Sequence, residues 1–209
     1  MISIKSDIIE RKEESDQMLA MIEDVSSVGG GVVRSAILKS AYVVMLYNAI
    51  EATISLVLER IHEEISHVQY VDLIPELKSI WVEFFFFNHP QKTFQAHVDG
   101  AVKNNLTIPL LKEFSERVKL FSGNLDARKI DEILKKYGIG ALSTPDRGQL
   151  LIIKTKRNKI AHGELSFKEG CRNMTKTELK RLQKATFSAL DSIVNQVESY
   201  IASKKFRIL

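Results

Sequence analysis

The stretch Ala41-Tyr42-Val43-Val44-Met45-Leu46-Tyr47-Asn48-Ala49-Ile50 is apolar on nearly all sides of a helix, and it decides the fold. It lies in the middle of a long helix predicted over residues 35–66, where apolar residues keep recurring at helical spacing. A helix that is apolar all round is buried in a core or shared with a partner subunit. We therefore expect the rest of the chain to pack around this helix.

Asn48 and Glu51 interrupt the apolar helix three residues apart, so their side chains share one face. Polar groups in apolar surroundings need hydrogen-bond partners. Two interpretations stay open at this point. Both side chains face solvent, or both form a supporting shell behind Arg157 and His162, which are discussed below.

Helical patterns cover most of the remaining chain. Thr144-Pro145-Asp146 predicts a helix start, with a capping hydroxyl, a proline at the first position and an acid in the first turn. Thr175 and Glu178 have the spacing of a capping box. No stretch alternates convincingly like a strand, so the predicted fold class is all-α. Besides 35–66, helices are predicted over residues 4–25, 72–87, 93–121, 127–137, 145–162 and 175–203.

A chain of 209 residues with 44% hydrophobic residues predicts one domain, 1–209, with a possible inserted helical segment at 88–140. The single cysteine, Cys171, excludes an internal disulfide and a cysteine-rich zinc site. The chain does not open with a signal-peptide pattern, and the apolar run 41–46 is too short to span a bilayer. We expect a cytoplasmic protein without membrane contact.

A run of phenylalanines and two isolated histidines are interpreted as structural. Phe84 to Phe87 are four adjacent phenylalanines that cover every side of a helical turn. Packing in a core or between subunits is the expected role, and base stacking lacks flanking basic residues. His89 and His97 have no carboxylate or cysteine pattern around them that would form a metal site.

Positive charge is concentrated late in the chain. Residues 154–184 contain ten lysines and arginines and three acids, a net charge of +7, in a chain whose total is +4. A basic segment on a mildly acidic body suggests an anionic partner. The alternative interpretation is that many of these lysines solvate a helix face, and charge alone leaves both interpretations open.

The basic segment begins beside Arg157-Asn158-Lys159-Ile160-Ala161-His162-Gly163, at the end of the helix predicted over 145–162. Histidine exchanges protons near neutral pH, and arginine binds phosphate with a planar fork of donors. Asn158 and His162 are four residues apart and share a helix face. Gly163 fits the position that ends a helix.

These residue types suit cleavage of RNA through the 2′-hydroxyl of ribose. His162 would transfer a proton, Arg157 would stabilise charge on the phosphate oxygens, and Asn158 would assist. No metal or cofactor is expected, because no carboxylate cluster accompanies the pair. One motif supplies one histidine, which favours a homodimer with a composite site. Three neighbouring lysines are expected to bind the RNA: Lys154, Lys156 and Lys159.

Arg157 to His162 resembles the Arg-x(4–6)-His motif of the HEPN superfamily, in which a polar residue commonly follows the arginine. The chain looks most similar to bacterial stand-alone HEPN proteins of the RiboL-PSP and MAE type. The block Leu120 to Ile130 and the helix–motif–helix ending at 144–203 also resemble that group. Some relatives have a tyrosine two residues after the histidine, where this chain has Glu164, so no role is carried over to that position.

The resemblance implies a helical bundle that dimerises, and in many relatives a metal-independent ribonuclease of toxin–antitoxin or defence systems. The resemblance therefore implies three kinds of partner: RNA, a second copy of the chain, and a cognate antitoxin or defence-system protein. Two other hypotheses stay open. The chain is a non-catalytic module that binds RNA or protein, or a helical interaction protein in which Arg157 and His162 are structural.

The spacing alone is a weak signal, because the chain contains it twice. Arg60 and His67 are also separated by a permitted distance. We discount this second pair because Ile61 follows the arginine in place of a polar residue. Glu63 and Glu64 also make the surroundings unfavourable for phosphate.

Overall fold

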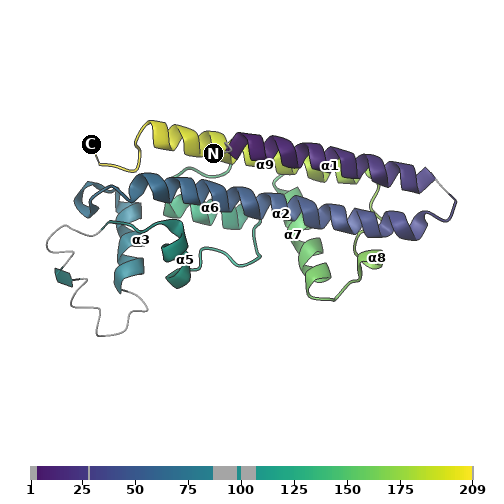
Figure 1. Ribbon diagram of the computed structural model, residues 1–209, viewed down its shortest axis with the longest axis horizontal. Helices are drawn as coiled ribbons and strands as arrows, with labels where there is room; N and C mark the ends of the chain where they lie inside the picture. Colours follow the sequence, from purple (N-terminus) through teal and green to yellow (C-terminus); the bar gives the residue numbers. More distant parts are fainter. Residues whose placement is uncertain (1–3, 28, 87–97, 100–106, 209) are drawn as a thin grey trace. The chain divides into compact units, whose positions relative to one another are not determined.

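The computed structural model describes residues 4–27, 29–86, 98–99 and 107–208. Within these ranges there is no strand, only two isolated bridges, so the predicted all-α fold is confirmed (Figure 1). Phe87, His89 and His97 lie outside the described residues. The helices are α1 (Ile4–Ser27), α2 (Val32–Ile65), α3 (Pro75–Phe86), α5 (Leu111–Arg117), α6 (Ala127–Lys136), α7 (Gly148–Ala161), α8 (Phe167–Gly170) and α9 (Lys176–Ala202), with a 3-10 helix η1 (Tyr70–Asp72) before α3.

The ends of the predicted helices agree with the structure to different degrees. At α9 the predicted capping box forms, because the Glu178 carboxylate accepts from the Thr175 amide at 2.7 Å and the Thr175 hydroxyl accepts from the Glu178 amide. At α7 the predicted cap by Thr144 is wrong, since its hydroxyl donates to the Pro145 carbonyl instead. Asp146 has a φ of 58°, outside the helical region, so α7 begins at Gly148 and not at Pro145.

The chain divides into two compact units, which are described separately. Unit 1 comprises residues 1–54, 123–128 and 143–194, and unit 2 comprises residues 55–122, 129–142 and 195–209. The helices α2 and α9 each contribute residues to both units. The single domain 1–209 and the inserted segment 88–140 stay predictions.

Unit 1 is built from α1, the first part of α2, α7, α8 and most of α9. The Gln183 amide of α9 donates to the Ser15 hydroxyl and the Asp16 carboxylate of α1, at 2.6 and 2.7 Å. Lys39 of α2 donates to the Met174 carbonyl at 2.7 Å. The central apolar stretch supplies much of the core, and each fully buried large side chain contributes about 2 kcal/mol. Fully buried side chains of unit 1 include Tyr42, Leu46, Tyr47, Ile50, Ile153 and Leu190.

Unit 2 has a core that contains one buried histidine. His62 of α2 donates from Nδ1 to the Pro109 carbonyl at 2.7 Å, and its Nε2 accepts from the Tyr137 hydroxyl at 2.8 Å. This pairing requires the neutral ring. Phe84 is buried and stacks on Phe114 with 5.6 Å between ring centroids, so the expected packing role of the phenylalanine run is confirmed for this residue.

Helix α2 is the one helix in the described part of the chain whose length and hydropathy would let it cross a membrane, judged by those two properties alone. Of its most apolar window, 56% is buried inside the structure, which is the pattern of a core helix. The apolar run 41–46 is too short to span a bilayer, but the whole helix α2 has 34 residues. A cytoplasmic location stays a prediction.

Candidate functional site: the Arg157 cluster of unit 1

Arg157 is held on several sides by residues of unit 1. Its Nη1 donates to the Asn158 Oδ1 at 3.1 Å and to the Gly123 carbonyl at 3.4 Å. Its Nη2 lies 3.6 Å from the Glu51 carboxylate, and its guanidinium carbon lies 4.5 Å from the centroid of the Tyr47 ring. The side chain is 23% exposed. The guanidinium therefore has a fixed plane and still reaches solvent.

Tyr47 and Glu51 reach Arg157 from α2, four residues apart on one helix face. The Tyr47 hydroxyl donates to the Glu51 Oε1 at 3.1 Å and accepts from the Leu125 amide at 3.1 Å. Burial, with a smaller contribution from Glu51, raises the pKa of Tyr47 to about 12. The phenol therefore stays protonated at neutral pH and remains a hydrogen-bond donor to Glu51.

The segment 123–126 forms another wall of the cluster. Gly123 has a φ of 69°, and a Cβ placed there would lie 3.0 Å from the Arg157 Nη1. Only glycine combines this backbone conformation with so close an approach at little cost. The next residue, Asn124, accepts at its Oδ1 from the Asn158 Nδ2 at 3.1 Å. Asn158 thus links the guanidinium to this segment.

His162 follows α7 as its C-cap residue and is exposed. Its amide donates to the Asn158 carbonyl at 2.9 Å, so the helix geometry continues up to the histidine. Gly163 then adopts a φ of 74° and ends the helix, as predicted from its position. The imidazole is therefore available to a ligand, one turn beyond Asn158 on the same helix.

The three lysines predicted to bind RNA have different surroundings. Lys154 forms an ion pair with the buried Asp126 at 2.6 Å, and Lys156 donates to the Gly170 carbonyl at 2.9 Å. The first two ammonium groups therefore hold parts of unit 1 together. Lys159 is exposed and has no such contact with any residue that the structure describes.

Asn48 and Glu51, the two polar residues that interrupt the apolar part of α2, have different surroundings in the structure. Asn48 is exposed, as one interpretation had it, whereas Glu51 contacts Arg157, as the other had it. Sequence reasoning missed Tyr47, Gly123 and Asn124. For Tyr47 a signal was present, because it lies four residues before Glu51, but an aromatic residue in an apolar run is usually a core residue.

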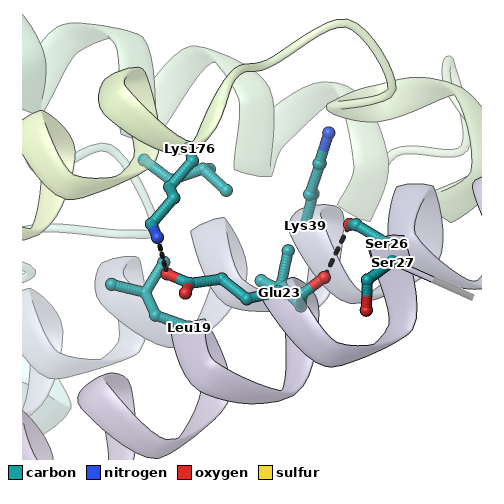
Figure 2. A pocket seen from close by; sticks show the side chains of 8 residues that line it. Leu19, Glu23, Ser26, Ser27, Lys39 and Lys176 are labelled. Atoms are coloured by element: carbon teal, nitrogen blue, oxygen red, sulfur yellow. Dashed lines mark hydrogen bonds and ion pairs between the residues drawn. The ribbon is translucent and has the colours of Figure 1, made fainter.

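Unit 1 also has a cavity of about 480 Å³ between α1, α2 and the start of α9 (Figure 2). Leu19 and Ile22 give it an apolar wall. Its charged groups already have partners, since Lys176 pairs with Glu23 at 2.6 Å and Lys39 donates to a carbonyl. We assign no ligand to this cavity.

The fold and the cluster define an all-α protein with an Arg-x4-His pair at the end of a helix. The family model of MAE_28990-like HEPN proteins matches residues 2–206, and the chain belongs to this family. Membership suggests a role in RNA cleavage or nucleotide binding. No curated protein and no solved structure gives a significant match to the chain.

Proposed function

We propose that this chain is a metal-independent endoribonuclease in which Arg157 and His162 act on RNA. One observation carries the proposal: the guanidinium is oriented by fixed partners, while an exposed histidine follows at the end of the same helix. Preorganised donors near a developing charge give large rate effects, because they need no rearrangement during the reaction.

The reaction is an internal transesterification. A base removes the proton of the 2′-hydroxyl, and the 2′-oxygen forms a bond to the adjacent phosphorus. The bond from phosphorus to the 5′-oxygen breaks, and that oxygen receives a proton from an acid. The products are a 2′,3′-cyclic phosphate and a 5′-hydroxyl, so no water enters the step. His162 suits the proton transfer, and Arg157 suits the charge on the phosphate oxygens.

Arg157 retains capacity to bind phosphate. A guanidinium has five N–H donors. In the described part of the chain, Nη1 donates to two acceptors, and Nη2 has only the long contact with Glu51 at 3.6 Å, so Nε and Nη2 can donate to a ligand. Lys159 adds an exposed positive charge two residues along α7. This arrangement supports two-point recognition of a phosphate.

We propose that the chain is a toxin or a defence effector, as its resemblance to HEPN ribonucleases implies. An endoribonuclease that acts on cellular RNA in the cytoplasm needs control, which a cognate antitoxin or a defence-system partner would supply. Expression of the active chain should then arrest growth, and Arg157→Ala and His162→Ala should relieve the arrest.

A second candidate function is a non-catalytic module that binds RNA or protein. It is favoured by the pairing of Arg157 with Glu51, because that contact already compensates part of the charge that a phosphate would meet. In that case the cluster holds α7 against α2 and residues 123–126 within unit 1. RNA binding without any cleavage would support this function.

The test uses purified chain, EDTA and two short RNAs that differ in one position. In the second RNA, the nucleotide at the mapped cleavage position carries 2′-deoxyribose. We expect the first RNA to yield 2′,3′-cyclic phosphate ends and the second to remain intact at that position. Cleavage of the deoxy-substituted bond would contradict attack by the 2′-hydroxyl.

A mixing experiment tests the composite homodimer. Wild type and His162→Ala are denatured together, refolded at varied ratios and assayed for cleavage. If each site needs a histidine from both copies, activity follows the square of the wild-type fraction. A linear dependence would contradict a composite site and leave a site within one chain.

A further inference from the structure

Helix α2 brings two side chains to Arg157 that the proposed reaction does not use. We propose that Tyr47 and Glu51 are a positioning pair for Arg157: Tyr47 fixes the guanidinium plane, and Glu51 is a counter-ion that an RNA phosphate displaces. This inference rests on the proposed function. It assigns no chemical step to either residue, because both act through Arg157.

Tyr47 connects the walls of the cluster. Its ring lies under the guanidinium at 4.5 Å, and its hydroxyl accepts from the Leu125 amide. The ring itself is fully buried, so the core fixes its position. Residue 125 follows closely after Gly123, whose carbonyl accepts from Arg157. A shift of this segment would therefore move both the carbonyl and the ring contact relative to the guanidinium.

Glu51 differs from the other partners because its contact with Arg157 is long. The Nη2–Oε2 distance is 3.6 Å, beyond a direct hydrogen bond, and both side chains are about a quarter exposed. Such pairs are weak, and a phosphate offers the guanidinium a better two-point geometry. The other carboxylate oxygen, Oε1, accepts from Tyr47, so Glu51 keeps a partner after displacement.

The consequence is a separation of roles that enzyme kinetics can measure. Loss of the Tyr47 hydroxyl should misplace Arg157 relative to the phosphate, which lowers kcat. Loss of the Glu51 charge should remove a competitor of the phosphate, which lowers KM and the Kd for RNA. If either residue were merely structural, its substitution would change stability without separate effects on kcat and on KM.

The experiment compares Tyr47→Phe and Glu51→Gln with matched controls in unit 2. Tyr70→Phe alters a tyrosine that lies beside Lys78, and Glu64→Gln alters a carboxylate that pairs with Arg60. We measure kcat, KM and the Kd of a noncleavable deoxy-substituted RNA at several salt concentrations. Circular dichroism checks that each variant is folded.

For Tyr47→Phe we expect kcat to fall about tenfold with KM nearly unchanged, because the ring stays while its two hydrogen bonds are lost. For Glu51→Gln we expect RNA to bind about two- to fivefold more tightly, with a steeper salt dependence. Both controls should match wild type. The inference is overturned if Tyr47→Phe keeps its kcat or if Glu51→Gln binds RNA more weakly.

A second measurement needs neither RNA nor activity. A double-mutant cycle combines Glu51→Gln with Arg157→Ala and follows unfolding by urea. We expect the unfolding equilibrium constant to depart from additivity by about threefold. Additive effects would overturn the pairing even in an active ribonuclease. Absence of cleavage by wild type, with coupling intact, would instead overturn the proposed function alone.

Discussion

Two arginines of this chain precede a histidine at a similar distance, and their surroundings differ. Arg60 lies on α2 with its side chain 47% exposed, and it pairs with Glu63 and Glu64 of its own helix. Arg157 is 23% exposed and contacts residues that lie about 100 and 34 positions away in the sequence, on α2 and in the segment 123–126. His67 and His162 are both exposed.

The difference shows that the spacing between arginine and histidine does not determine how the arginine is held. Ion pairs between residues three or four apart form readily on exposed helices and contribute little to stability or orientation. Arg157 is oriented by tertiary contacts, and these include an aromatic face and a backbone carbonyl that carry no charge. Among the described residues, none accepts a hydrogen bond from its Nε or Nη2, so both groups can donate to a ligand.

The histidines give the largest contrast. His162→Ala should lower the rate of RNA cleavage by about 100-fold or more, because a group in general acid–base catalysis contributes at least that much. His67→Ala should cleave at the wild-type rate. A gel assay of labelled RNA in EDTA measures both. Equal rates for the two variants would remove the distinction between the two pairs.

The second prediction concerns the buried histidine beside Arg60. Burial lowers the pKa of His62 to about 4, although the hydrogen bond to the Pro109 carbonyl opposes this shift. Between pH 6.5 and pH 4 the unfolded chain therefore binds the extra proton and the folded chain does not. This group makes the free energy of unfolding fall by about 3 kcal/mol as the pH decreases through that range.

Urea unfolding of wild type and His62→Gln across this pH range provides the measurement. The glutamine variant should lose this part of the pH dependence, and His162→Ala, which removes an exposed histidine, should retain it. The segment near Arg60 would then matter for stability and not for cleavage. An unchanged pH dependence in His62→Gln would contradict the assignment.

The third prediction separates two lysines of α7. Lys154→Ala leaves the buried Asp126 carboxylate without its ammonium partner and should lower the free energy of unfolding by about 2 kcal/mol. Lys159→Ala should leave stability unchanged and weaken RNA binding about threefold at low salt. Thermal unfolding and RNA titrations measure the two effects. A stable Lys154→Ala with weak RNA binding would instead support the predicted RNA-binding role of Lys154.

Among the predicted losses of stability, the smallest is expected at Gly123. Gly123→Ala should destabilise the chain by about 1 kcal/mol through its positive φ, and the new methyl group should also displace the guanidinium of Arg157. Gly30→Ala is the control, since Gly30 has a φ of 81° and open space around it. Both variants should lose stability, but only Gly123→Ala should lose cleavage activity. Equal activities would argue against the close contact.

Much of the fold follows from periodicity and capping, because those depend on neighbours in sequence. The central apolar helix and the Thr175–Glu178 capping box were predictable for this reason. The start of α7 was not, because the Thr144-Pro145-Asp146 pattern is the same whether or not Asp146 takes a positive φ.

The candidate site was predictable only in part. Arg157, Asn158 and His162 stand close together in the sequence, so a motif can indicate them. Their partners Tyr47 and Gly123 are brought to Arg157 by packing. The spacing of Tyr47 from Glu51 was a weak signal, and Gly123 carried none. Lys154 was expected to bind RNA because the segment is basic, but charge patterning does not reveal that Asp126 lies beside it.

The most direct test measures cleavage of one labelled RNA in EDTA by wild type, Arg157→Ala and Arg60→Ala. We expect 2′,3′-cyclic phosphate products at equal rates from wild type and Arg60→Ala, and none from Arg157→Ala over the same period. Cleavage by Arg157→Ala at the wild-type rate, or equal loss in both variants, would contradict the catalytic role of Arg157.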